Sequence, residues 1–175
     1  MRLIDKGKLL SQSLYITWNA VTSALTSPMA GTATSATSGT AKTILQLKAG
    51  TKIQPIEWGY IITSTPTSPL QLELLDTSTV GATVTAGSIS NYNNPADQAS
   101  VCTTGTSATG FNASAEGTIT STRLLAQTFD LSTYMKQQYP LDREPEVPSG
   151  NFLRIRATPT TNTASTVLAY LIWGE

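Results

Sequence analysis

The stretch TVLAYLIW at residues 166–173 decides the fold class. Its residues alternate with a period of two, and both alternating sets are apolar. One set comprises Val167, Ala169, Leu171 and Trp173, and the other comprises Leu168, Tyr170 and Ile172. Alternation predicts a β-strand, and a strand with two apolar faces is either central or covered on its second face. We therefore expect one set to face a core, and the second set is a candidate for contact with another subunit.

Similar alternation recurs along the chain between clusters of Gly, Pro, Ser and Thr. The expected strands cover residues 13–19, 42–49, 53–63, 70–74, 80–86, 118–129 and 152–157, with 134–141 as a strand or a single helical turn. Pro55 implies an edge strand or a bulge, because proline cannot donate to a ladder. The polar stretch 87–117 predicts a long loop region with room for one short strand. No segment shows helical periodicity over three turns, so we predict an all-β chain: a single β-sandwich of the jelly-roll kind.

The first 40 residues differ from the rest, so we predict an N-terminal arm and linker at 1–40 and the sandwich domain at 41–175. Residues 22–40 are almost wholly Ser, Thr, Ala and Gly, which bury little apolar surface and predict an extended linker or surface loop. The segment before this linker is apolar, through Leu9, Leu10, Leu14, Ile16 and Trp18. Two arrangements are open. The segment folds back on its own sheet, or it reaches a neighbouring subunit and these side chains form an interface.

Composition argues against several kinds of chemistry. The chain contains no histidine, which removes Ser-His-Asp and Cys-His activation of a nucleophile and most zinc and non-haem iron sites. It has no glycine-rich phosphate loop. Cys102 is the single cysteine, so no intrachain disulfide can form, and we expect it to be a small buried residue. We predict that the chain is not an enzyme and uses no cofactor or metal.

Charge favours protein partners over nucleic acid. The 11 basic and 11 acidic residues cancel, and the isoelectric point is about 6.3, whereas nucleic-acid binding usually leaves a basic stripe. Charged residues make up only 13% of the chain, and a weakly charged surface is poorly protected against self-association. The start MRLIDKGKLLSQS lacks the apolar run of a signal peptide, and no run approaches the roughly 20 apolar residues of a membrane span. We expect synthesis in the cytoplasm and no membrane partner.

A group of charged residues in the run YPLDREPEVPSG, at 139–150, is a candidate ion-pair segment together with two arginines downstream. The candidates are Asp142, Arg143, Glu144, Glu146, Arg154 and Arg156. The prolines impose an extended path that places the acids on one side. Three roles are open: ion pairs with the two downstream arginines, a hard cation such as calcium, or a catalytic carboxylate pair. We expect structural or interfacial ion pairing.

The run YPLDREPE at 139–146 resembles a YPLGREPE-type segment in small structural proteins of tailed bacteriophages. The runs KTILQL at 42–47, IEWG at 56–59 and NFLRIRA at 151–157 are similar to strands of the same proteins. The resemblance covers roughly residues 40–175, and Asp142 stands where the family pattern has Gly. It implies a virion protein, of the minor capsid or head decoration type, that is often trimeric and binds the major capsid protein.

From the residues and this resemblance together we expect a capsid decoration protein on the surface of a phage head. It would be made in the host cytoplasm, form a homotrimer and stabilise the shell through symmetric protein–protein contacts. The alternative is a carbohydrate- or receptor-binding module of a phage fibre or tail. For that function, Tyr92 within NYNNPADQ is the best candidate, because such a site gathers exposed aromatic and amide groups.

Overall fold

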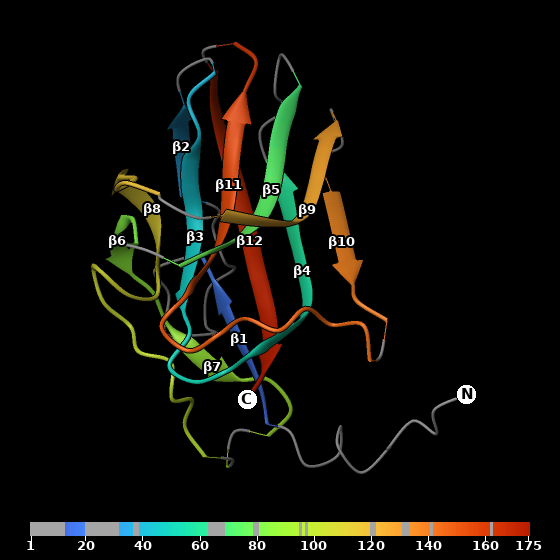
Figure 1. The fold of residues 1–175 in the computed structure, drawn as a ribbon. Helices are drawn as coiled ribbons and strands as arrows, with labels where there is room; N and C mark the ends of the chain where they lie inside the picture. The colour runs from blue at the N-terminus through green and yellow to red at the C-terminus, as the bar shows by residue number, and fades with distance from the viewer. Residues whose placement is uncertain are drawn as a thin grey trace.

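The computed structural model describes residues 13–19, 32–36, 39–62, 69–78, 81–94, 96, 98–119, 122–130, 134–140, 142–161 and 163–175. Within these ranges the chain is all-β. The strands are β1 Leu14–Trp18, β2 Thr32–Ala36, β3 Lys42–Lys48, β4 Gln54–Ile62, β5 Leu70–Thr77, β6 Thr83–Ala86, β7 Ile89–Asn91, β8 Gly110–Ala115, β9 Thr122–Asp130, β10 Tyr134–Gln138, β11 Phe152–Pro159 and β12 Thr163–Gly174. They form two antiparallel sheets that pack face to face, which confirms the predicted β-sandwich (Figure 1).

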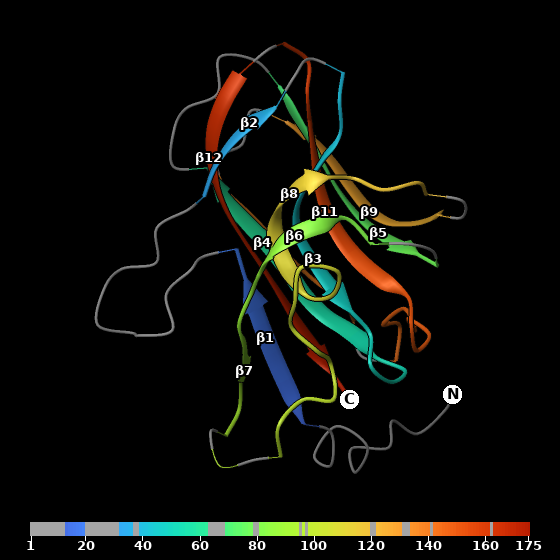
Figure 2. The same ribbon diagram turned by 90° about the vertical axis from the view of Figure 1, so that its left-hand side faces the viewer.

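The two sheets have the strand order of a jelly roll. Sheet A runs β10-β4-β12-β1-β7, with β2 also pairing with β12, and sheet B runs β6-β8-β3-β11-β5-β9. Sheet B lies in front of sheet A in Figure 1, and Figure 2 shows the two layers from the side. Eight of the strands form two four-stranded blocks, β1-β12-β4-β10 and β3-β11-β5-β9. The chain changes sheet at every step from β3 through β4 to β5, and again from β9 through β10 and β11 to β12. This is the predicted jelly-roll arrangement.

Three short strands, β6, β7 and β8, are inserted between β5 and β9 and extend both sheets on one side. β7 adds to β1 in sheet A, while β8 adds to β3 in sheet B and carries β6 beyond it (Figure 2). The opposite side of the sandwich keeps β9 and β10 as its edges (Figure 1). The stretch 87–117, predicted as a long loop with room for one short strand, therefore holds two short strands, β7 and β8.

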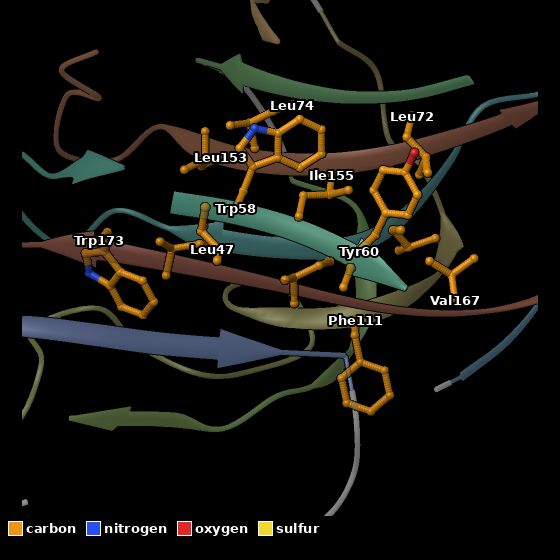
Figure 3. Packing of buried hydrophobic residues seen from close by; sticks show 14 of the residues in the cluster. Leu47, Trp58, Tyr60, Leu72, Leu74, Phe111, Leu153, Ile155, Val167 and Trp173 are labelled. Atoms are coloured by element: carbon orange, nitrogen blue, oxygen red, sulfur yellow. The ribbon is translucent and has the colours of Figure 1, made fainter. Parts of the chain in front are cut away.

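The core lies between the two sheets and is built from the inward half of each strand's alternation (Figure 3). The set predicted from β12 is wholly buried there: Val167, Ala169, Leu171 and Trp173. Trp58 of β4 is fully buried, and the Tyr15 ring of β1 lies 5.9 Å, between centroids, from that of Trp173. One set of the decisive strand thus faces the core, as predicted.

The N-terminal segment differs from the predicted arm. β1 pairs with β12 along its whole length and with β7 on its other side, so it is an inner strand of sheet A. Of the two open arrangements, residues 14–18 take the first and form a strand of the chain's own sheet. Tyr15 contributes its ring to the core of that sandwich. The predicted linker at 22–40 also contains β2, which pairs with the first part of β12. Leu9 and Leu10 lie outside the described residues.

Two smaller alternatives are also resolved. β4 is an inner strand between β10 and β12, and its register against β12 shifts between Ile172 and Trp173, opposite Glu57 and Pro55. Pro55 therefore marks a bulge, just beyond the part of β4 that pairs with β10. Residues 134–138 form the strand β10 and not a helical turn.

Candidate functional site

The outer face of sheet A collects the side chains that alternate with the core residues of its strands. Side chains directly opposite each other on antiparallel strands share a face, so the register extends the outward set of β12 to its neighbours. The first row across β10, β4 and β12 is Tyr134, Ile61 and Leu168. The second row, which continues to β1, is Lys136, Gly59, Tyr170 and Trp18. The third row is Gln138, Glu57, Ile172 and Ile16.

The structure places six of the eight candidate interface residues on this single face. Five of them form what we call the apolar strip: Leu14, Ile16 and Trp18 of β1 with Leu168 and Ile172 of β12. Trp18 and Ile172 are buried, and the other three are half-buried. Beside the strip, the Ile61 side chain of β4 remains 39% exposed. The side chains that the sequence grouped from two distant segments are thus neighbours in space.

Next to the apolar strip lies the tyrosine cluster, defined as Glu57, Tyr134, Lys136 and Tyr170. The Tyr170 hydroxyl donates to Glu57 Oε1 at 2.7 Å, and Lys136 Nζ lies 2.9 Å from Glu57 Oε2. Burial, and then the hydrogen bond to Glu57, raises the pKa of Tyr170. The same carboxylate raises the pKa of the Lys136 ammonium through its hydrogen bond and its charge. Glu57 therefore holds two side chains from two neighbouring strands.

Gly59 explains why the Tyr170 ring lies where it does. A Cβ at Gly59 would stand 2.7 Å from Tyr170 Cε1 and 2.8 Å from its hydroxyl oxygen, so the ring lies directly over the glycine. Any larger residue would force the ring away from Glu57. Sequence reasoning missed this cluster, although a glycine inside a strand signals a close approach of this kind.

The charged residues of the candidate ion-pair segment have other partners than the predicted ones. Arg156 binds Glu73 of β5 at 2.8 Å, directly across the ladder, and Arg154 lies 3.8 Å from Glu116. These arginines stand in the middle of β11, where the adjacent strand and the 116–119 segment supply their carboxylates. Of the acids in the run 139–150, Glu146 forms an exposed ion pair with Lys52 at 3.0 Å.

The remaining members of that segment show no sign of a cation site. Asp142 and Arg143 are exposed and Glu144 is half-buried. Among the residues that the structure describes, no three potential metal ligands gather at one place. Asp142 has a φ of 65°, in the left-handed region that glycine enters at little cost. Asp142 therefore holds a backbone conformation that is more costly for it than for a glycine.

A polar cavity of about 310 Å³ lies at the end of the sandwich near the last residue. It is lined by Ser13, Tyr15, Thr51, Gln98, Ala99, Val101 and Glu175. The Glu175 carboxylate accepts from Ser100 Oγ at 2.5 Å, from the Val101 amide at 2.9 Å and from Trp173 Nε1 at 3.0 Å. Burial acts to raise its pKa, but these donors outweigh that effect and lower it. Its oxygens are engaged in fixing the loop at 98–102.

The remaining candidate groups, the Cys102 thiol and the loop around Tyr92, show no reactive arrangement either. Burial raises the pKa of the Cys102 thiol to about 12, so it stays protonated and is a poor nucleophile. Around Tyr92, the loop amides hold the loop itself: Asn93 Oδ1 accepts from the Leu14 amide, and Asn91 Nδ2 donates to the carbonyl of Asn94. The Tyr92 ring is left 55% exposed at the rim of sheet A.

Comparisons of the chain with models of known protein families, with curated proteins and with solved structures find no match. No helix within the described ranges is long and apolar enough to cross a membrane. Among the described residues, the outer face of sheet A, with its apolar strip and its tyrosine cluster, is the best candidate for a binding surface.

Proposed function

We propose that this chain is a structural virion protein that decorates the outer surface of a phage head. It acts without chemistry, by binding copies of itself and the major capsid protein, and it stabilises the shell through symmetric contacts. The observation that carries the proposal is the apolar strip, which joins β1 and β12 on the outward face of sheet A. The resemblance of residues 139–146 to phage structural proteins supports the choice of partner.

The outer face of sheet A as a whole is somewhat smaller than a standard protein contact. Its five strands lie about 4.8 Å apart, and the paired part of β12 from Val167 to Gly174 rises about 3.4 Å per residue. These spacings give a face of about 24 Å by 27 Å, or about 650 Å². A standard protein interface takes about 800 Å² from each partner. Repetition around a symmetry axis then adds avidity without requiring any strong single contact.

The charge of the face also suits a protein partner of low charge. Its one acid, Glu57, is paired with Lys136, and the apolar strip carries no ionisable group. Two copies of the chain, or the chain and a neutral surface, can therefore meet without like-charge repulsion. The net charge of zero agrees with this.

Binding to heads and self-association test the proposal with one pair of variants. Leu168→Asp places a charge in the apolar strip, while Leu124→Asp places the same charge on β9 of sheet B, where the leucine is 51% exposed. The wild type and Leu124→Asp should sediment as oligomers at micromolar concentration and saturate purified heads of the cognate phage. Leu168→Asp should lose at least about tenfold in both affinities, since burying an unpaired charge costs several kcal/mol. A monomeric wild type that ignores heads, or equal behaviour of the two variants, would contradict the proposal.

The alternative function, carbohydrate or receptor binding, is favoured by a different observation, the tyrosine cluster. Three of its four members lie on β4 and β10, while Tyr170 lies on β12 between Leu168 and Ile172 of the strip. The two activities therefore use different residues of one face and can be separated by mutation.

A further inference from the structure

The tyrosine cluster has one ring that is fixed in place. Tyr170 lies over Gly59, and its hydroxyl is tied to Glu57, which in turn binds Lys136. Glu57 is itself largely buried, with 12% of its side chain exposed, so the anchor does not move freely with solvent. A ring held this way keeps its orientation before any ligand arrives, which lowers the entropy lost on binding.

A second ring stands near the fixed one. Tyr134 is 55% exposed on β10 and lies in the next row, beside Ile61 and Leu168. The fixed ring comes from β12 and the exposed ring from β10, so two tyrosines from separate parts of the chain share one region of the face. A tyrosine offers an apolar ring together with a polar hydroxyl.

The polar groups of the cluster carry no net charge. Its one ammonium, Lys136, is paired with its one carboxylate, Glu57, and the next residue along β10 on this face is the exposed amide Gln138. An anionic ligand would have to compete with Glu57 for the ammonium, and a cationic ligand would meet that ammonium. A neutral ligand rich in hydroxyl groups can use the remaining donors and acceptors of all three side chains without breaking the pair.

We propose that the tyrosine cluster binds a neutral saccharide chain. The C–H faces of the sugar rings would pack on Tyr170 and Tyr134, and the sugar hydroxyls would bond with Lys136, Glu57 and Gln138. This agrees with the general design of ligand sites, in which apolar area supplies affinity and a few placed polar groups supply orientation. The inference does not depend on the decoration function, which rests on the apolar strip.

A protein partner is the competing occupant, because tyrosine is also enriched at protein interfaces. The composition of the face separates the two cases. The strip on β1 and β12 is aliphatic apart from Trp18. The cluster instead brings the rings of Tyr170 and Tyr134 together with the polar groups of β4 and β10, beside Ile61. An aliphatic surface gives a sugar few partners, while rings beside paired polar groups match its mixed surface. The cluster therefore fits the saccharide better than the strip does.

Titration of the ¹⁵N-labelled full chain with neutral hexasaccharides tests the inference. The probes are maltohexaose, cellohexaose and chitohexaose, with hyaluronate hexasaccharide as the charged comparison. At least one neutral probe should shift the amide signals of β4, β10 and β12, with half-saturation at about 1 mM, and bind more tightly than hyaluronate. Affinity should be unchanged between about 0.05 M and 0.5 M salt, because no net charge is recognised. Absence of shifts with all three neutral probes, or shifts that map elsewhere, would overturn the inference.

Variants then identify the residues. Tyr134→Ala should weaken saccharide binding about fivefold, the effect of losing one stacked ring, whereas Leu124→Ala on sheet B should leave it unchanged. Leu168→Asp should keep saccharide binding while losing head binding, so failure of one proposal does not imply failure of the other. If Tyr134→Ala weakens head binding or self-association and leaves every saccharide titration unaltered, the cluster is a protein contact and the inference is wrong.

Discussion

The two outer faces of this sandwich are opposite in character. On sheet B the outward side chains include polar and charged groups that are nevertheless buried, among them Gln46, Thr43 and Arg154. On sheet A the outward side chains are mostly apolar, yet several remain half-buried or exposed. The chain thus covers the face that needs hydrogen-bond partners and leaves accessible much of the face that would gain from burial. That distribution is expected of a protein whose apolar face meets a partner.

The cover on sheet B is the chain's own insertion between β5 and β9. Gln46 is the main attachment: its side-chain oxygen accepts from the Ala82 amide at 2.7 Å, and its nitrogen donates to the Ala108 carbonyl at 2.7 Å. Glu116 accepts from both the amide and the hydroxyl of Thr43. Buried polar groups are costly unless they are bonded, so these contacts hold the insertion against sheet B.

Two leucines at equivalent outward positions should show the largest difference in stability between the two faces. Leu75 lies on the outer face of sheet B opposite Arg154 and is buried, and Leu168 lies on the outer face of sheet A opposite Ile61. Leu75→Ala should lower the free energy of unfolding by about 3 kcal/mol, through lost burial and a cavity. Leu168→Ala should lower it by less than about 1 kcal/mol, since the side chain is already partly in water. Urea unfolding monitored by tryptophan fluorescence measures both.

Equal losses at the two positions would mean that sheet A is as well covered as sheet B. The apolar strip would then be an ordinary part of the folded chain, and the proposed interface would lose its basis. Self-association of the wild type has to be controlled by working below its association concentration, because a bound partner adds to apparent stability.

The fold class could be predicted from the sequence because a strand with one buried face has an apolar residue at every second position. The alternation in residues 166–173 placed Trp173 and its set in the core, and the absence of helical periodicity predicted a sandwich. The sequence left the placement of residues 14–18 open for a related reason. Alternation shows that one face of β1 is apolar and the other partly so, but it cannot show whose sheet the strand joins. Pairing of β1 with β12 spans the length of the chain, and no local pattern encodes it.

The candidate site was predicted in part. Both apolar sets on β1 and β12 were identified from alternation, while their meeting on one face depends on that same long-range pairing. Apart from Tyr170, the tyrosine cluster was missed because its members come from β4, β10 and β12, and each alone looks like an ordinary surface residue. Arg154 and Arg156 were expected to pair with the acids of residues 139–150, and in the structure they pair with Glu116 and Glu73. No local sequence pattern shows that these two carboxylates lie closer to the arginines.

Removing the Gln46 side chain, which attaches the insertion to sheet B, should have a second, smaller effect on stability. Gln46→Ala should lower the free energy of unfolding by about 2 kcal/mol, because it leaves the Ala82 amide and the Ala108 carbonyl without their side-chain partner. The matched control is Gln138→Ala on the outer face of sheet A, which is exposed and should change stability by less than about 0.5 kcal/mol. Hydrogen exchange should also speed up in β6 and β8 of the Gln46 variant. Unchanged exchange there would show that the insertion is held by other contacts.

The smallest effect concerns pH, and it distinguishes the faces by their access to solvent. The pKa of Tyr170 is raised in the folded protein, first by burial and then by Glu57, above the value of about 10 in an unfolded chain. The folded state therefore keeps the phenol proton at a pH where the unfolded chain loses it. The stability contributed by this group is complete below pH 10 and declines as the pH rises further.

The measurement compares urea unfolding of the wild type and Tyr170→Phe from about pH 8 to about pH 11. The phenylalanine ring still fits over Gly59, so the variant removes the hydroxyl and its bond to Glu57 while keeping the packing. Lys136 faces the same carboxylate in both proteins. The difference in free energy of unfolding between the wild type and the variant should be constant below about pH 9 and shrink above about pH 10. An advantage that stays constant through this range would show that the hydroxyl is not held by Glu57. The fixed ring on which the saccharide inference depends would then be absent from the folded protein in solution.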